Sequence, residues 1–294
     1  MANVTSNKTT TQKAERRTAE VIHYTLSYIV QGEEHGPDGA IVLLHDIPAG
    51  AFTWESIMPR LASLGRAVYA IDMLGFGESD HPWPADTSVW GQADALLYLL
   101  QQLHLTNVVL VGHGFGGGVA QILATRLFRE ETRALILVDT ICYQHAFARN
   151  WPLADMEKSQ DLDAPKQTKL EDFINDLRTT LPSAAVKSKD FSKVIDNYVN
   201  QWNSELGKEV LLRHISLLNP VYVNSVSSDL RNLDKPALII WGEKDEQNPI
   251  KYAHRLNREM AGSKLVIVPG AGHVAIFDAP DAVANAIGEF VQEL

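Results

Sequence analysis

The chain has little of the material that several protein classes need. Its 294 residues include a single cysteine, Cys142, which excludes an intrachain disulfide framework and any Cys-x-x-Cys metal or redox motif. No run reaches the roughly 18 consecutive apolar residues of a membrane span. Lys and Arg number 26 against 36 Asp and Glu, and the net charge of -10 argues against a nucleic-acid surface. These absences predict a cytoplasmic protein whose partners are neither membranes nor nucleic acids.

Cofactor motifs are also missing. The histidines lack the His-Glu-x-x-His spacing of a zinc site, and the glycine-rich stretch 112–118 is not followed by the Gly-Lys-Ser/Thr of a phosphate-binding loop. We therefore predict no metal and no cofactor. Residues 1–18 are rich in Thr, Asn and Lys and have no apolar centre, which predicts a disordered tail rather than a secretory signal.

What the sequence does contain is a regular alternation of buried strands and helices. Hydrophobic residues make up 45% of the chain, enough for a sizeable core. A strand pattern begins near residue 19 and alternates up to residue 29. Continuous apolar runs of the kind seen in parallel strands then occur at 40–45, 67–71, 107–111, 134–138, 237–241 and 264–268. Segments with helical periodicity separate them, so we predict an α/β fold with a doubly wound, mostly parallel sheet.

The alternation stops in the middle of the chain. Residues 141–229 contain no buried strand, and 169–180, 191–202 and 206–218 read as amphipathic helices. The prediction is one core domain, built from residues 19–140 and 230–294, with a helical insertion at 141–229.

One short stretch indicates the family. In Leu110-Val-Gly-His-Gly-Phe-Gly-Gly-Gly118 a strand runs into a tight glycine turn and then a helix, with Gly114 at the apex. This resembles the nucleophile elbow, Gly-x-Ser-x-Gly, of the α/β-hydrolase fold superfamily, and the insertion resembles that family's cap. The resemblance extends over about 19–294. In the family the apex carries Ser, or Asp or Cys in some branches, whereas Gly114 has no side chain with which to attack a substrate.

A second signature follows the strand at 40–45. Leu44-His-Asp-Ile-Pro48 is similar to the family's His-Gly-x-Pro, which implies that the amides of Ile47 and Phe115 form an oxyanion hole. The departure is Asp46, which stands where glycine is usual. A carboxylate there would oppose the negative charge that the hole must stabilise. We therefore expect Asp46 to point away, towards a turn or a helix terminus.

Two further residues complete the expected site. Asp245 follows the strand at 237–241, and His273 follows the last strand in Gly-Ala-Gly-His. The order of apex, acid and histidine is that of the α/β-hydrolase triad, so the resemblance implies that Asp245 orients His273 as general base. Asp139 is an alternative acid, for which we expect a structural role.

The substrate class stays open at this point. The elbow suits the Ser branch (esterases, lactonases and C–C bond hydrolases) but also resembles the Asp branch, which includes epoxide hydrolases. Phe115 argues against the haloalkane dehalogenases, which often carry Trp there. Aromatic residues of the insertion, Trp151, Tyr198 and Trp202, are expected to line a pocket for a fairly apolar small molecule. The oligomeric state cannot be predicted.

Gly114 allows three interpretations. In the first, it stands for a Ser or Asp that was substituted, and restoring either residue should create hydrolysis. In the second, it is natural, and the His273–Asp245 pair acts as general base in an elimination, a cyclisation or the activation of water. In the third interpretation the pocket binds a ligand without turnover.

Overall fold

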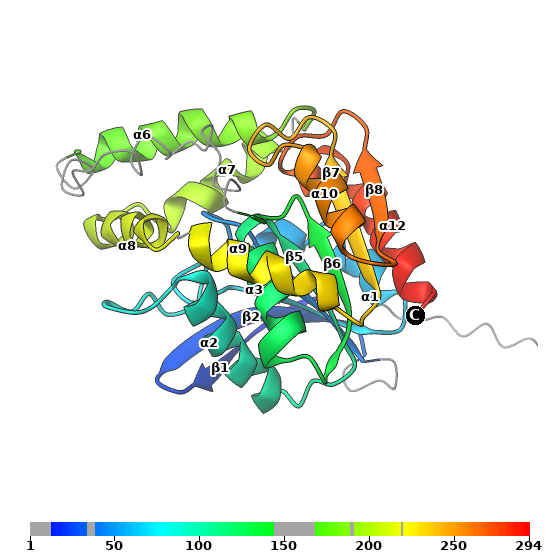
Figure 1. Ribbon diagram of the computed structural model, residues 1–294. Helices are drawn as coiled ribbons and strands as arrows, with labels where there is room; N and C mark the ends of the chain where they lie inside the picture. The colour runs from blue at the N-terminus through cyan, green and yellow to red at the C-terminus, as the bar shows by residue number, and fades with distance from the viewer. Residues whose placement is uncertain (1–12, 34–38, 144–167, 189–190, 219) are drawn as a thin grey trace, which may run out of the picture.

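The computed structural model describes residues 13–33, 39–143, 168–188, 191–218 and 220–294. Its strands form one sheet of eight, in the order β1-β2-β4-β3-β5-β6-β7-β8 (Figure 1). β1 and β2 pair antiparallel, as do β2 and β4, and the other neighbours are parallel. The strands are Glu15–Val21 (β1), Tyr24–Gln31 (β2), Ala40–Leu44 (β3), Ala67–Ile71 (β4), Val108–His113 (β5), Thr132–Val138 (β6), Ala237–Gly242 (β7) and Lys264–Val268 (β8). The predicted doubly wound, mostly parallel sheet is confirmed.

The start of the sheet corrects the sequence prediction. The strand expected from residue 19 is divided between the two halves of a hairpin, because a turn at Ile22, which has φ 59°, separates β1 from β2. β1 begins at Glu15, paired with Val30, so residues 15–18 belong to the sheet and not to a tail. The outermost strand is polar along one face, which hides it from an apolar pattern. Residues 1–12 lie outside the described residues.

Helices cover both faces of the sheet because its central strands are apolar on both sides. One layer packs α2, α3 and α10 against one face, and the other packs α1, α11 and α12 against the opposite face. No helix of the described ranges is both long and apolar enough to cross a membrane. The helices are Met58–Ala62 (α1), Val89–Gln102 (α2), Gly114–Ile122 (α3), Lys251–Glu259 (α10), Ala275–Asp278 (α11) and Pro280–Gln292 (α12), with short 3-10 or π segments at Ala51–Trp54 (η1), Leu123–Leu127 (η2), Leu181–Ala184 (η3) and Leu230–Asn232 (η4).

The described part of the insertion between β6 and β7 contains helices joined by short loops and no strand. Figure 1 shows α6, α7 and α8 beyond the edge of the sheet, whereas α9 packs beside α2 and α3. Three of these helices were predicted; α9, which begins at a proline and is rich in Val and Ser, was not. The four helices are Leu170–Thr180 (α6), Phe191–Asn200 (α7), Glu205–Ser216 (α8) and Pro220–Asp229 (α9).

Polar contacts attach the insertion to the loops that follow β3 and β4. The Gln201 side chain accepts a hydrogen bond from the Gly77 amide (2.9 Å) and donates one to the Pro48 carbonyl (2.9 Å). The indole nitrogen of Trp202 donates to the same carbonyl at 3.3 Å. The His214 ring stacks on Phe76, with 4.3 Å between centroids. The insertion therefore covers the loop that carries Asp46.

Candidate functional site

The candidate site lies at the carboxyl ends of the parallel strands, where an open α/β sheet usually binds ligands. β3 leads directly into the loop of Asp46, and β5 ends at His113 just before Gly114. Asp245 follows β7 and His273 follows β8. Residues far apart in the sequence therefore meet in one buried cluster.

His273 is held by the carboxylate that the sequence indicated. Its Nδ1 lies 2.9 Å from Asp245 Oδ2. Asp245 Oδ1 in turn accepts the backbone amides of Gln247 (2.9 Å) and Asn248 (2.8 Å), which fixes the carboxylate. A carboxylate has no proton to donate, so Nδ1 of His273 carries one. Asp139 Oδ1 instead accepts the Gly242 amide at 2.6 Å, which is the structural role expected of it.

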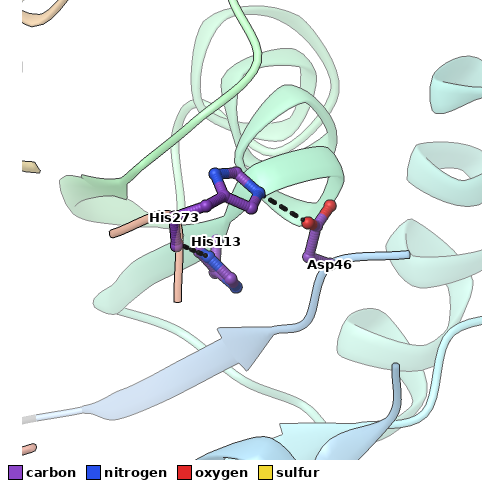
Figure 2. Close-up of side chains that lie close together, drawn as sticks. All are labelled: Asp46, His113 and His273. Atoms are coloured by element: carbon purple, nitrogen blue, oxygen red, sulfur yellow. Dashed lines mark hydrogen bonds and ion pairs between the residues drawn. The ribbon is translucent and has the colours of Figure 1, made fainter. Parts of the chain in front are cut away.

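Asp46 does not point away from the site, and that expectation is wrong. One of its oxygens, Oδ2, lies 3.0 Å from His273 Nε2, as Figure 2 shows. The other, Oδ1, accepts the Phe115 amide at 2.6 Å. The carboxylate does face a helix terminus, but it is the N-terminus of α3, which carries the amide expected in the oxyanion hole. The positive end of the helix stabilises the anion there.

The Asp46 carboxylate occupies the space that a side chain at position 114 would need. A Cβ added to Gly114 would lie 2.1 Å from Asp46 Cγ, far inside van der Waals contact. Gly114 also has φ +51°, as a tight strand-to-helix turn requires. Any side chain at the apex would therefore displace the carboxylate, and Asp46 fills the position that the apex residue has vacated.

Two buried histidines, which the sequence pattern does not single out, hold the cluster. Met73 N–H donates to His45 Nε2 at 3.0 Å, so Nδ1 carries the proton and donates it to the Asp46 carbonyl at 2.8 Å. His113 Nε2 donates to the His273 carbonyl at 2.8 Å (Figure 2). The available signal was position, since both residues flank the two loops of the predicted oxyanion hole.

Electrostatics set the protonation of the pair. Burial opposes the imidazolium of His273, but the carboxylates of Asp245 and Asp46 outweigh it and raise the pKa of His273 well above its ordinary 6.5. Burial likewise opposes the Asp46 carboxylate, yet the hydrogen bond from His273 lowers the pKa of Asp46. Burial lowers the pKa of His113 to about 4, so this ring is neutral. At neutral pH an imidazolium lies between two carboxylates, and His273 begins as a proton donor.

This arrangement predicts how stability depends on pH. Because the pKa of His273 is raised by folding, its contribution is complete below about pH 6.5 and is lost as the pH rises through the folded-state value. The free energy of unfolding of the native protein should therefore exceed that of His273→Gln most at pH 5 to 6. We expect the difference to shrink steadily towards pH 9 in urea titrations. A difference that stays constant or grows over that range would contradict the assignment.

A small pocket adjoins the cluster. The space open to the centre of a water molecule is about 20 Å³, enough for about one water. Tyr198 lines it, as predicted, whereas Trp202 is fully buried against Phe76 and is not among the lining residues. Trp151 lies outside the described residues. The lining consists of Asp46, Ile47, Pro48, His113, Leu181, Ala184, Phe191, Tyr198, Gln247, His273 and Val274.

Asp46, His113 and His273 also bring three potential metal ligands within 4.8 Å of one another. However, Asp46 and His273 bond each other, and His113 Nε2 bonds a carbonyl. A cation would first have to break the Asp46–His273 contact. The group is better described as a hydrogen-bonded chain than as a prepared metal site.

Comparison with known proteins identifies the family of the chain. A family model described as alpha/beta hydrolase fold matches residues 39–280. The chain belongs to the α/β-hydrolase fold family. Its identity to a 2-hydroxymuconate semialdehyde hydrolase of Pseudomonas sp. strain CF600 is 25% over 273 residues, covering 88% of this chain and 89% of that protein.

Two further proteins are similar over comparable lengths. An uncharacterised protein of Mycobacterium tuberculosis strain H37Rv is 29% identical over 277 residues, 87% of this chain and 76% of the relative. Among solved structures, the haloalkane dehalogenase DbeA of Bradyrhizobium elkanii superposes with a TM-score of 0.80 at 19% identity, over 96% of this chain and 98% of that one. This structural likeness supports the fold alone.

Proposed function

We propose that this α/β-hydrolase is an enzyme that hydrolyses a small, fairly apolar molecule and that His273 is its proton-transfer group. The observation that carries the proposal is the hydrogen-bonded chain Asp46–His273–Asp245, with bonds of 3.0 and 2.9 Å, beside a small pocket. The hydrolase name of the Pseudomonas relative supports the reaction class.

The chain of residues suits proton transfer in both directions. Asp245 keeps the Nδ1 proton in place and stabilises the imidazolium, so that exchange with the substrate takes place at Nε2. His273 can first give its Nε2 proton to a leaving oxygen. Once neutral, it can take a proton from water. The amides of Ile47 and Phe115 remain the proposed oxyanion hole, and Tyr198 a proposed substrate contact.

A ligand-binding protein without turnover is the second candidate. The observation that favours it is the hydrogen bond of 2.6 Å from the Phe115 amide to Asp46, which already satisfies one donor of the expected oxyanion hole. If that bond never opens and has no role in catalysis, the protein binds a ligand in the pocket but does not convert it. The experiment below separates the two candidates.

The test is turnover of a panel containing p-nitrophenyl acetate, a γ-lactone and styrene oxide by the native protein and by His273→Gln. We expect at least one member to be hydrolysed and kcat/KM to fall about 10³-fold in the variant, because general acid–base catalysis is lost. The exposed His254→Gln on α10 serves as a matched control and should retain full activity. Ligand binding with no turnover of any member, or full activity in His273→Gln, would overturn the proposal.

A further inference from the structure

We propose that Asp46 is the nucleophile of this enzyme and that its substrate is an epoxide. The inference rests on the proposed function, because it requires His273 to transfer protons. It places the attacking group on the loop after β3 and not on the elbow, where Gly114 has no side chain.

The position of the Asp46 carboxylate is that of an apex nucleophile. The Asp46 carboxylate lies where a side chain of residue 114 would begin, since the added Cβ would be 2.1 Å from its Cγ. It also borders the cavity and contacts His273 Nε2, as an apex nucleophile would. The two departures in this sequence, Gly114 and Asp46, therefore compensate each other.

The two carboxylate oxygens of Asp46 are held by different groups. Oδ1 is fixed by the Phe115 amide at 2.6 Å, while Oδ2 is 3.0 Å from the imidazole. If Oδ2 were alkylated, Oδ1 would become the ester carbonyl oxygen. A preplaced amide would then stabilise the negative charge that forms on Oδ1 when water attacks. The backbone is fixed as well, because the Asp46 carbonyl accepts from His45 Nδ1 (2.8 Å) and from the Ala49 amide (2.9 Å).

A carboxylate nucleophile beside a proton donor favours an epoxide over an ester or an alkyl halide. Attack of a carboxylate on an ester would give a mixed anhydride, which is more reactive than the ester consumed. Attack on an alkyl halide releases an anion that needs no proton. Opening an epoxide leaves an alkoxide, and the imidazolium of His273 provides the proton that this oxygen needs.

The first step is then balanced. Oδ2 of Asp46 forms a bond to an epoxide carbon, and the ring C–O bond breaks. Its electron pair stays on the oxygen, which takes the Nε2 proton of His273. The products are a β-hydroxyalkyl ester of Asp46 and a neutral imidazole.

The second step regenerates the site. Neutral His273 takes a proton from water as the water oxygen attacks Cγ of Asp46. The tetrahedral oxyanion on Oδ1 collapses and expels the diol oxygen, which takes that proton back from Nε2. The carboxylic acid that remains gives its proton to His273. Epoxide and water have become a vicinal diol, and the carboxylate–imidazolium pair is restored. The cavity of about 20 Å³ has room for this water, while an epoxide requires cavity-lining side chains such as Leu181 and Phe191 to move.

The test follows the oxygen atoms. Native enzyme in excess over styrene oxide is allowed one turnover in H₂¹⁸O, and the diol and the peptide that contains Asp46 are weighed by mass spectrometry. We expect ¹⁸O in the Asp46 carboxylate and unlabelled diol, with no label in a parallel sample without epoxide. Labelled diol with unlabelled Asp46 would overturn the inference, because water would then have attacked the epoxide directly.

Variants separate this inference from the proposed function. Asp46→Asn and Asp46→Ala, checked for native circular dichroism, should each lose at least about 10³-fold in epoxide turnover. Retained turnover in both, with loss in His273→Gln, removes the nucleophile and leaves the proposed function intact. Hydrolysis of esters or of 1-chlorobutane without epoxide turnover overturns the substrate class. Loss of all turnover on EDTA treatment, with recovery on adding Zn²⁺, would make Asp46 a ligand and overturn its role as nucleophile.

Discussion

The double variant Asp46→Gly with Gly114→Ser is expected to hydrolyse p-nitrophenyl acetate, whereas neither single variant does. In Gly114→Ser alone, the new Cβ would lie 2.1 Å from the Cγ of Asp46 and 2.2 Å from its Oδ1. The hydroxyl and the carboxylate cannot share that space. In Asp46→Gly alone, neither position carries a side chain that can attack the ester.

The double variant removes the conflict and frees the Phe115 amide from Asp46 Oδ1. The serine hydroxyl would then occupy the place of the carboxylate beside His273 Nε2, and the amide would be available for the oxyanion. We expect kcat/KM at least about 10³-fold above either single variant, with a burst of p-nitrophenol from acylation. Measurement of the burst against active-site concentration checks this. Equal activity in Gly114→Ser alone would show that Asp46 does not occupy the apex position.

A second large effect is expected at Gly116, in the first turn of α3. A Cβ there would lie 2.5 Å from the carbonyl oxygens of both His45 and Leu44. These are backbone atoms of β3 and its end, which cannot move without disturbing the sheet. Gly116→Ala should therefore cost about 3 kcal/mol of unfolding free energy, at the upper end for overpacking. It should also move the Phe115 amide away from Asp46 and reduce activity.

Gly288 in α12 is the matched control. Its added Cβ would come no closer than 4.0 Å to the methyls of Leu64. Because alanine favours the helix, Gly288→Ala should raise stability by up to about 1 kcal/mol. Urea unfolding of the two variants beside the native protein gives both values. Similar effects from the two substitutions would contradict the close packing of α3 on β3.

Much of the fold could be predicted because the central strands have a distinctive sequence pattern. A parallel strand buried on both faces must be apolar throughout, as Ala40–Leu44 and Ala134–Val138 are. The repetition of such apolar runs along the chain indicates the parallel sheet. The elements missed are those whose burial is decided by neighbours. β1 lies at the edge with polar residues outward, and α9 is stabilised by packing beside α2 and α3 more than by helix propensity.

The site divides in the same way. The sequence by itself determined that the apex lacks a side chain and that Asp245 and His273 follow consecutive strands of a parallel sheet, whose carboxyl ends must meet. In the sequence alone, Gly114 indicates a lost nucleophile, and Asp46 indicates a carboxylate that would oppose the charge in the oxyanion hole. Only the tertiary structure decided that they are complementary. Asp46 and Phe115 are 69 residues apart in the sequence, but β3 pairs with β5, so the loop after β3 contacts the start of α3. A clash of 2.1 Å, or its avoidance, exists only in three dimensions.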